Sequence, residues 1–201
     1  RPAMFRYPKH YDVIVIGAGH AGVEAAMAAA RLGAQVAILT QNLDTIGQMS
    51  CNPAIGGLAK GHMVREIDAL GGIMGLNTDA TAIQWRMLNA SKGPSVRAPR
   101  AQCDKKAYQF RLKRELEAMP GIEIHQGNVA DLLVAHDKIV GIATSLGLEI
   151  AGKTVVLSAG TFMGGLMHVG LRNEKGGRMG DATSHVSESL KRLGFEVARF
   201  K

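Results

Sequence analysis

The feature that most constrains the fold of this chain is a glycine motif close to its start. The pattern G-x-G-x-x-G occupies residues 17–22 and directly follows an apolar stretch, residues 11–16. An alanine-rich stretch comes next, and a second apolar stretch follows at residues 35–39. A strand, a glycine turn, a helix and a second strand form a βαβ unit, the context in which this motif binds a dinucleotide. The sequence therefore predicts a Rossmann-like α/β domain.

Each glycine of the motif has its own expected role. Gly17 permits the tight turn after the strand, Gly19 lets the backbone approach a pyrophosphate, and Gly22 lets the helix pack closely on the strand. The N–H groups and the positive dipole end of that helix would hold the diphosphate. The whole motif is predicted to bind the cofactor: Gly17, Ala18, Gly19, His20, Ala21 and Gly22. The alternative is a βαβ unit whose glycines serve packing alone and whose His20 fills a position in the turn.

The end of the second strand departs from the usual dinucleotide pattern. An acidic residue about 20 positions after the motif normally binds a ribose 2′-hydroxyl group. Thr40 stands at that point. A threonine hydroxyl can still form a hydrogen bond with a ribose, so Thr40 is predicted to be a cofactor contact, and the pattern leaves the identity of the dinucleotide open.

The rest of the chain continues the α/β order. Helical spacing of apolar residues predicts helices at residues 58–70 and 101–119. Short strands are predicted at residues 122–125, 129–134, 139–144, 148–150 and 154–158. This order resembles the FAD-binding domains of the glutathione reductase type. We therefore expect one FAD-binding domain, residues 1–201, with a central parallel sheet, a three-stranded antiparallel meander and an inserted segment at about residues 41–105.

Composition narrows the class of protein. With 201 residues, 46% of them hydrophobic, the chain is long enough to bury a core as one domain. No apolar run reaches the roughly 18 residues that a membrane-spanning helix needs, so no membrane association is expected. Two cysteines 52 positions apart and seven histidines show no metal-binding spacing, so no metal is predicted. This cysteine usage favours a reducing compartment, either a bacterial cytoplasm or, in a eukaryote, an organelle.

Basic residues are concentrated in one part of the chain. Between Lys92 and Arg114 there are eight basic residues and one acidic residue, so this segment alone carries the net charge of +7 of the whole chain. Lysine and arginine neutralise nucleic-acid phosphates without reading sequence. Lys92, Arg97 and Arg100 lie in a loop rich in glycine and proline and are predicted to contact nucleic acid. The cations after Arg100 fall on a predicted helix, where they can equally be ordinary solvated charge.

Three stretches carry a more specific resemblance. They are MSCNPAIGGLAKGHMVREIDALGG (residues 49–72), QWRMLNASKGPSVRAPRAQCD (84–104), and SAGTFMGGLMHVG with GGRMGD (158–170 and 176–181). They resemble the MnmG family, also called glucose-inhibited division protein A, and the resemblance runs from about Tyr11 to Lys201. It covers only the amino-terminal part of the family's length, so we expect the chain to be a fragment of a longer protein.

The resemblance implies a function. It implies an enzyme that modifies the wobble uridine of certain tRNAs at C5 with a carboxymethylaminomethyl group. It also implies bound FAD, NADH as the reductant, a tetrahydrofolate as the one-carbon donor, a homodimer and a GTPase partner. The nicotinamide-binding insertion and the region that meets the GTPase are expected beyond Lys201, so this fragment alone would be incomplete for catalysis.

The resemblance also implies individual site residues. Residues 17–22 would hold the FAD diphosphate, Val129 would present its backbone to the adenine, and Ser184 would contact the flavin nucleotide. Gly160, which follows the apolar strand, is assigned to the cofactor as well. Residues 182–183 are alanine and threonine where the family carries proline.

Cys51 lies among turn-forming residues, with Asn-Pro after it and Gly-Gly a few positions further on. Placed beside a flavin, its thiol could attack C6 of a uracil ring and make C5 nucleophilic, or it could serve in proton transfer, so Cys51 is predicted to be catalytic. The thiolate is the reactive form, and a helix N-terminus or the cation Lys60 would favour it. The alternative is a structural thiol shielded by the loop. Cys103 is interpreted as a packing residue.

Two other functions stay open. A flavin oxidoreductase that acts on a small molecule would use the glycine motif, but it would leave the concentrated positive charge without a purpose. An FAD-binding module that only scaffolds partners would not need Cys51.

Overall fold

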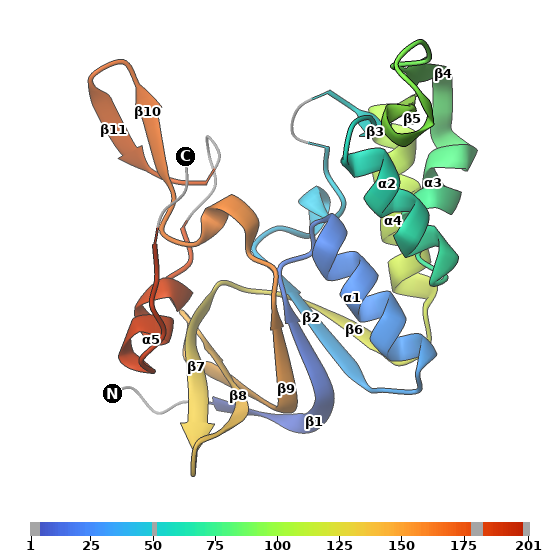
Figure 1. Cartoon of the computed structure of the whole chain (residues 1–201). Coiled ribbons are helices and arrows are strands. Elements are labelled where there is room, and N and C mark those ends of the chain that lie inside the picture. Colours follow the sequence, from blue (N-terminus) through green and yellow to red (C-terminus); the bar gives the residue numbers. More distant parts are fainter. Residues whose placement is uncertain (1–4, 50–51, 178–182, 199–201) are drawn as a thin grey trace.

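A six-stranded sheet forms the centre of the molecule. The computed structural model describes residues 5–49, 52–177 and 183–198. Helix α1 (His20–Arg31) covers one face of the sheet, and a second group of helices and short strands stands beside α1 (Figure 1). The parallel strands end along a single edge of this sheet, and this edge is the place where the predicted cofactor residues are expected to meet.

The strands of the central sheet are, in chain order, β1 (Phe5–Ile16), β2 (Val36–Thr40), β6 (Ile122–Gln126), β7 (Val129–Ala135), β8 (Lys138–Thr144) and β9 (Leu148–Leu157). Their spatial order is β6-β2-β1-β9-β8-β7. The first four in this order are parallel, and the last three form an antiparallel meander, so β9 belongs to both parts. The predicted parallel sheet with a meander is confirmed.

Strand β9 corrects one detail of the prediction. It runs through residues 151–153, which lie between the strands predicted at 148–150 and 154–158, and joins these two strands into one. The strand pairs antiparallel with β8 on one side and parallel with β1 on the other. Gly152 lies inside this strand, and a Cβ there would lie 2.6 Å from Cδ1 of Ile14. This glycine allows close packing across the sheet.

Both faces of the sheet are covered by apolar side chains. All five residues of β2 are buried, as expected for a strand in the middle of a covered parallel sheet. One face packs against α1. The core on this side of the sheet includes the large buried side chains of Val23, Met27, Ile38, Tyr108 and Leu112. The core on the other face consists of Tyr11, Ile14, Ile16, Ala37, Leu39, Val129, Ile142, Ile150 and Val186.

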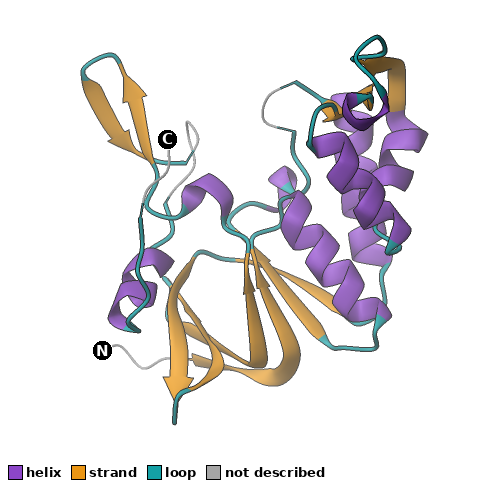
Figure 2. Cartoon of the chain, viewed as in Figure 1, coloured by secondary structure: helices purple, strands orange, loops and turns teal. Residues whose placement is uncertain are grey.

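Between β2 and β6 the chain builds a second layer, which we call the insert. A short 3₁₀ helix, η1 (Leu43–Thr45), leads into it. The elements of the insert are β3 (Ala54–Gly56), α2 (Lys60–Ala69), α3 (Ile73–Thr81), β4 (Ala82–Leu88), η2 (Pro94–Val96), β5 (Ala98–Cys103) and α4 (Lys105–Ala118). The strands form an antiparallel sheet in the order β3-β5-β4, and the three helices lie together beside it (Figure 2).

The start of α4 differs from the prediction. The helix was predicted from residue 101, but residues 98–103 form β5 and the helix begins at Lys105. The Asp104 carboxylate accepts hydrogen bonds of 2.9 Å from two N–H groups of the first helical turn. This carboxylate therefore caps the helix and fixes its start.

Glu24 joins α1 to the insert. Its carboxylate accepts hydrogen bonds from the N–H groups of Ile73, at 3.0 Å, and Met74, at 2.7 Å, at the N-terminus of α3. At the other end of α1, the Arg31 guanidinium donates to the carbonyl of Gly71. Charged groups of α1 thus hold the insert at two points.

After β9 the chain forms η3 (Gly160–Phe162), the hairpin of β10 (Leu166–Val169) and β11 (Arg172–Lys175), and α5 (Val186–Arg192). Helix α5 packs against β7, where the Asp131 carboxylate accepts hydrogen bonds from Ser189, at 2.6 Å, and Arg192. The β10–β11 hairpin and the insert stand on opposite sides of the edge at which the parallel strands end (Figure 1). Within the described ranges, no helix combines the length and the apolar character needed to cross a membrane.

Candidate cofactor site and basic hairpin

A cavity lies at the carboxyl ends of β1, β2 and β9, the place where open parallel sheets bind ligands. Its volume is about 370 Å³. It is lined by residues 16–19, 39–42, 45, 48, 127–129, 158–162, 177 and 184. The predicted cofactor residues in this lining are Gly17, Ala18, Gly19, Thr40, Val129, Gly160 and Ser184. The fold thus brings together residues that lie far apart in the sequence.

Gly17 and Gly22 fix the turn between β1 and α1. Gly17 has a φ of +101°, and a Cβ there would lie 2.5 Å from the carbonyl oxygen of Ser158. A Cβ on Gly22 would lie only 1.8 Å from the carbonyl oxygen of Gly17. Real Cβ atoms do not approach backbone this closely, so both positions require glycine.

Gly19 stands in a different environment. A Cβ there would meet no atom within 4 Å. Gly19 precedes α1, no side chain caps that helix, and its first turn has no acidic residue. The positive end of α1 therefore faces open space at the cavity. This space and these N–H groups fit a dinucleotide diphosphate, because the phosphate oxygens can occupy the volume that a side chain would fill.

His20 and Ala21 belong to the motif but do not line the cavity. The His20 ring is directed toward α4, where its centroid lies 5.6 Å from that of Tyr108. Its Nε2 atom is buried and has no hydrogen-bond partner among the described residues. Burial, followed by the nearby charge of Lys60, lowers the pKa of this imidazole. The neutral ring therefore packs between α1 and the insert, and only the backbone N–H of His20 remains as its predicted phosphate contact.

Thr40 ends β2 inside the cavity, but its hydroxyl is used locally. Its Oγ1 donates to the carbonyl of Asn42 over 3.1 Å and accepts from the N–H of the same residue over 3.4 Å. Beside it, Gln41 donates to Oδ1 of Asn128 over 3.5 Å, and both residues line the cavity. The sequence analysis missed Gln41, Asn42 and Asn128, since these amides follow no fixed spacing from the glycine motif. They place hydrogen-bonding groups where an acidic residue is usual.

Val129 and Ser184 meet at another wall of the cavity. Ser184 Oγ donates to the carbonyl of Val129 over 2.9 Å and accepts from the N–H of Val186 over 3.3 Å. Next to this contact, Asn128 donates to the carbonyl of Thr183 over 3.1 Å. These bonds hold the segment before α5 against β7. The contacts of Val129 and Ser184 with a nucleotide stay predictions.

Gly160 begins η3 with a φ of +57°, and a Cβ there would meet no atom within 4 Å. Ser158, at the end of β9, is fixed to the end of β1, because its Oγ donates a hydrogen bond to the carbonyl of Ile16 over 2.9 Å. The ends of β1 and β9 are therefore held side by side, and residues 159–162 after Ser158 form part of the cavity lining.

Cys51 lies outside the described residues, so its catalytic role stays a prediction. Cys103 is described and is 1% exposed in the core between α1, the sheet and the insert. Burial raises the pKa of its thiol, which keeps the sulfur protonated. The interpretation of Cys103 as a packing residue is confirmed. Among the described residues, no three histidine, cysteine, aspartate or glutamate side chains gather as metal ligands would.

The structure divides the basic segment into two parts, of which α4 is the first. Arg111 pairs with Glu115 at 3.5 Å, and Lys113 pairs with Asp44 at 3.6 Å. These cations are therefore partly neutralised by the protein itself, as expected for ordinary solvated charge on a helix.

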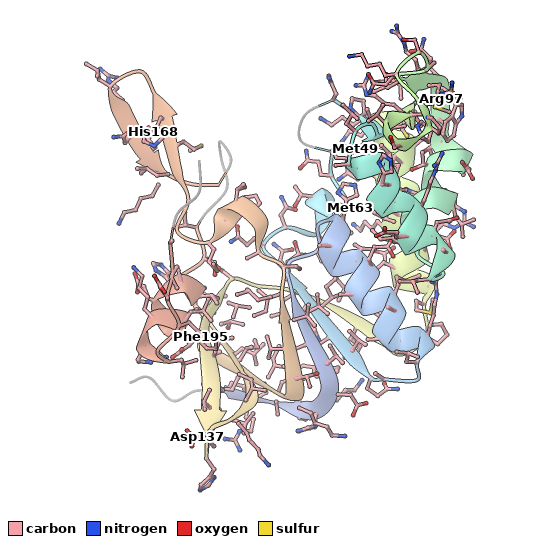
Figure 3. The ribbon with its side chains drawn as sticks, viewed as in Figure 1. Met49, Met63, Arg97, Asp137, His168 and Phe195 are labelled. Atoms are coloured by element: carbon pink, nitrogen blue, oxygen red, sulfur yellow. The ribbon has the colours of Figure 1, made fainter. Side chains whose placement is uncertain are left out.

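The second part is the hairpin that joins β4 to β5. Lys92 and Arg97 are exposed on it, Arg100 is partly exposed, and Figure 3 shows Arg97 at its outer end. Arg97 Nε donates to the carbonyl of Ala90 over 2.9 Å, which orders the loop. None of these three cations forms an ion pair with a described residue. The hairpin is therefore a positive surface without an internal counter-charge.

Comparisons with known proteins agree with one another. The profile of the family described as Glucose inhibited division protein A matches residues 12–201. The tRNA uridine 5-carboxymethylaminomethyl modification enzyme MnmG of Chlamydia trachomatis serovar L2b is 59% identical over 199 residues, which cover 98% of this chain and 33% of that protein. A crystal structure of GidA from Aquifex aeolicus is 50% identical with a TM-score of 0.89, over 93% of this chain and 31% of its own.

The chain thus spans about a third of the length of these relatives. A more distant crystal structure, of PqsL from Pseudomonas aeruginosa, described as a probable FAD-dependent monooxygenase, is 14% identical with a TM-score of 0.52, over 73% of this chain and 42% of its own. This last likeness shows a shared fold alone. Because the family profile covers nearly the whole sequence, the chain belongs to the glucose inhibited division protein A family.

Proposed function

We propose that the cavity binds FAD, with the diphosphate at the N-terminus of α1. The observation that carries the proposal is the contrast among the motif's glycines, since backbone fills the side-chain space of Gly17 and Gly22 but leaves that of Gly19 open. FAD is favoured over a nicotinamide dinucleotide by the meander β7-β8-β9 and by the family resemblance. Gln41 and Asn128 supply hydrogen-bonding groups for the ribose hydroxyls, and the backbone of Val129 faces the adenine.

The test is the uptake of flavin by the whole protein. Purified protein should be yellow, and flavin-free protein should bind FAD stoichiometrically in a titration followed by flavin fluorescence. NAD added in excess should not displace it. Folded protein that remains colourless and takes up no FAD would contradict the proposal.

We infer further that the whole protein modifies the wobble uridine of tRNA at C5. The Chlamydia relative is named for this reaction, and the cations of the hairpin between β4 and β5 supply a surface for tRNA phosphates. When bound, FAD would supply the redox chemistry. NADH, a tetrahydrofolate one-carbon donor, a homodimer and a GTPase partner are part of the same proposal.

Nucleoside analysis of tRNA tests this reaction. Cells that lack the gene should accumulate tRNA without the carboxymethylaminomethyl group, and the wild-type gene should restore it. Unchanged tRNA in the deletion strain would exclude the proposed activity, whatever the outcome of the flavin titration.

We propose that the thiol of Cys51 is the catalytic nucleophile of this reaction. Support comes from its place in the family's C-N-P-A-I-G-G stretch and from the burial of the other cysteine of the chain, Cys103. Cys51→Ser should abolish tRNA modification while FAD content stays unchanged. Cys103→Ala is the matched control and should retain activity with some loss of stability. Activity that survives in Cys51→Ser would leave the thiol a structural role only.

A further inference from the structure

Two arginines face each other across the sheet of the insert. In the antiparallel register of β4 and β5, Arg86 is directly opposite Arg100. Cross-strand partners project from the same face of a sheet, and like charges in this position destabilise it. On its other side, Arg100 is opposite Gly56 of β3, which has no side chain to contribute a counter-charge.

The protein does not neutralise this pair within the described residues. Neither arginine forms an ion pair there, whereas Arg111 and Lys113 on α4 both do. Arg86 is exposed and Arg100 is partly exposed, so neither residue is buried in the described structure. The two like charges therefore lie unpaired on an exposed surface, and an anion bound between them would reduce their repulsion.

Two glutamines extend the same face by one more row. Gln84 is directly opposite Gln102, and side chains two positions apart on a strand share a face. The rows Arg86–Arg100 and Gln84–Gln102 together offer charged and neutral hydrogen-bond donors side by side. We call this the arginine–glutamine face.

We propose that the arginine–glutamine face binds the sugar–phosphate backbone of the RNA substrate, with one phosphate held between Arg86 and Arg100. This inference rests on the proposed function and deepens it, since Arg86, Gln84 and Gln102 join the three cations already assigned to tRNA. Arginine binds phosphate through paired N–H groups, and the glutamine amides suit phosphate or ribose oxygens. RNA is favoured over a single small anion because Lys92 and Arg97 continue the unneutralised charge along the hairpin.

The salt dependence of RNA binding tests the proposal. The whole protein is titrated with an unmodified tRNA transcript at several salt concentrations, as wild type and as Arg86→Gln/Arg100→Gln. The double variant should bind about tenfold more weakly near physiological salt. The slope of log K against log salt should become shallower by about 1, because the one phosphate held between the two arginines is no longer bound. FAD content should be unchanged.

The control removes the same charge from a distant surface. Lys138 begins β8 and Lys191 lies on α5, both are exposed, and neither forms an ion pair with a described residue. Lys138→Gln/Lys191→Gln should keep the wild-type slope. If the wild type binds tRNA and Arg86→Gln/Arg100→Gln binds it with the same affinity and salt slope, this inference is wrong but the proposed function stands. A wild type that does not bind tRNA overturns the proposed function with it.

Stability without RNA gives an independent readout. Arg86→Gln removes the repulsion, so it should raise the midpoint of thermal unfolding at low salt, and added salt should reduce the gain. A lower midpoint with normal tRNA binding would mean that acidic groups of the protein itself neutralise the pair, and the inference would fail. A photoreactive side chain at position 84 should crosslink to tRNA, whereas the same group at position 138 should not. Absence of the crosslink at 84 also counts against the proposal.

Discussion

The cavity beside β1 and the hairpin between β4 and β5 differ in whether their polar side chains have partners within the protein. In the cavity wall, the hydroxyls of Thr40, Ser158 and Ser184 each bond to a nearby carbonyl group. In the insert, Arg86 and Arg100 are placed face to face, with no acidic partner among the described residues. The side-chain hydroxyls of the cavity wall are paired before a ligand arrives, whereas the two arginines of the insert carry charge that is still to be balanced.

This difference separates two kinds of recognition. A wall whose side-chain hydroxyls are already paired keeps its shape, which suits a cofactor held in one geometry through backbone contacts. Unneutralised cations suit a polyanion that is bound and then released, with an affinity that falls as salt rises. The cavity should therefore respond to changes of shape and the hairpin to changes of charge.

The largest effect is expected from a single methyl group at Gly22, where α1 packs against the turn that lines the cavity. Gly22→Ala would place a Cβ 1.8 Å from the carbonyl oxygen of Gly17 and 2.7 Å from Oγ of Ser158, and the Gly17 backbone has little room to move. We expect a loss of about 3 kcal/mol or more in the free energy of unfolding, together with loss of FAD binding. Thermal unfolding and the flavin titration measure the two effects.

Gly19→Ala is the matched control for this prediction. Its Cβ would meet no atom of the chain, so the free energy of unfolding should change by less than about 1 kcal/mol. The same methyl group would occupy the space in which we propose that the phosphates lie. FAD affinity should therefore fall about tenfold, which corresponds to about 1.4 kcal/mol of binding free energy. Equal effects of the two substitutions on stability would refute the different roles assigned to Gly19 and Gly22.

The next largest loss of stability is expected at the contact between α1, beside the cavity, and α3 of the insert. Glu24→Ala removes the carboxylate that caps α3, at a cost of about 1–2 kcal/mol. Hydrogen exchange should quicken in α3 while FAD binding persists. Glu66→Ala, an exposed carboxylate on α2, should change neither. If Glu24→Ala instead releases FAD, the cavity and the insert are not independent, and the contrast between them is weaker than the contacts indicate.

The βαβ unit was predictable because its determinants are local. The need for glycine at positions 17 and 22 follows from a turn of six residues, although Ser158, far along the sequence, also approaches Gly17 closely. His20 belongs to the same motif, yet the direction of its side chain depends on Tyr108, which lies on α4 and far along the sequence. Thr40 lines the cavity and its cofactor contact stays a prediction, but its hydrogen bonds to Asn42 could not be foreseen from spacing.

The insert was the less predictable region. Strand β5 is the central strand of its sheet, although Pro99 lies within it and proline normally argues against such a position. The strand forms through pairing with β3 and β4, and its sequence shows no regular alternation of apolar and polar residues. Residues 101–103 were therefore assigned to the following helix. The opposition of Arg86 and Arg100 became visible only with the strand register.

The smallest effect should come from the contact that holds α5 beside the cavity wall. Burial raises the pKa of the Asp131 carboxyl, but hydrogen bonds from Ser189 and Arg192 outweigh it and hold that pKa below its usual value. A lowered folded pKa adds stability above the ordinary carboxyl pKa, about 3.9, which is lost as pH falls through the folded value. Asp131→Asn should therefore cost about 0.5–1 kcal/mol near pH 6 and progressively less toward pH 3. Unfolding by urea across this range measures the difference, and Asp137→Asn, at an exposed turn, should show none. If the loss in free energy of unfolding caused by Asp131→Asn stays constant with pH, packing rather than charge fixes α5. The shape of the cavity would then depend on apolar contacts as well as on the hydrogen bonds in its wall.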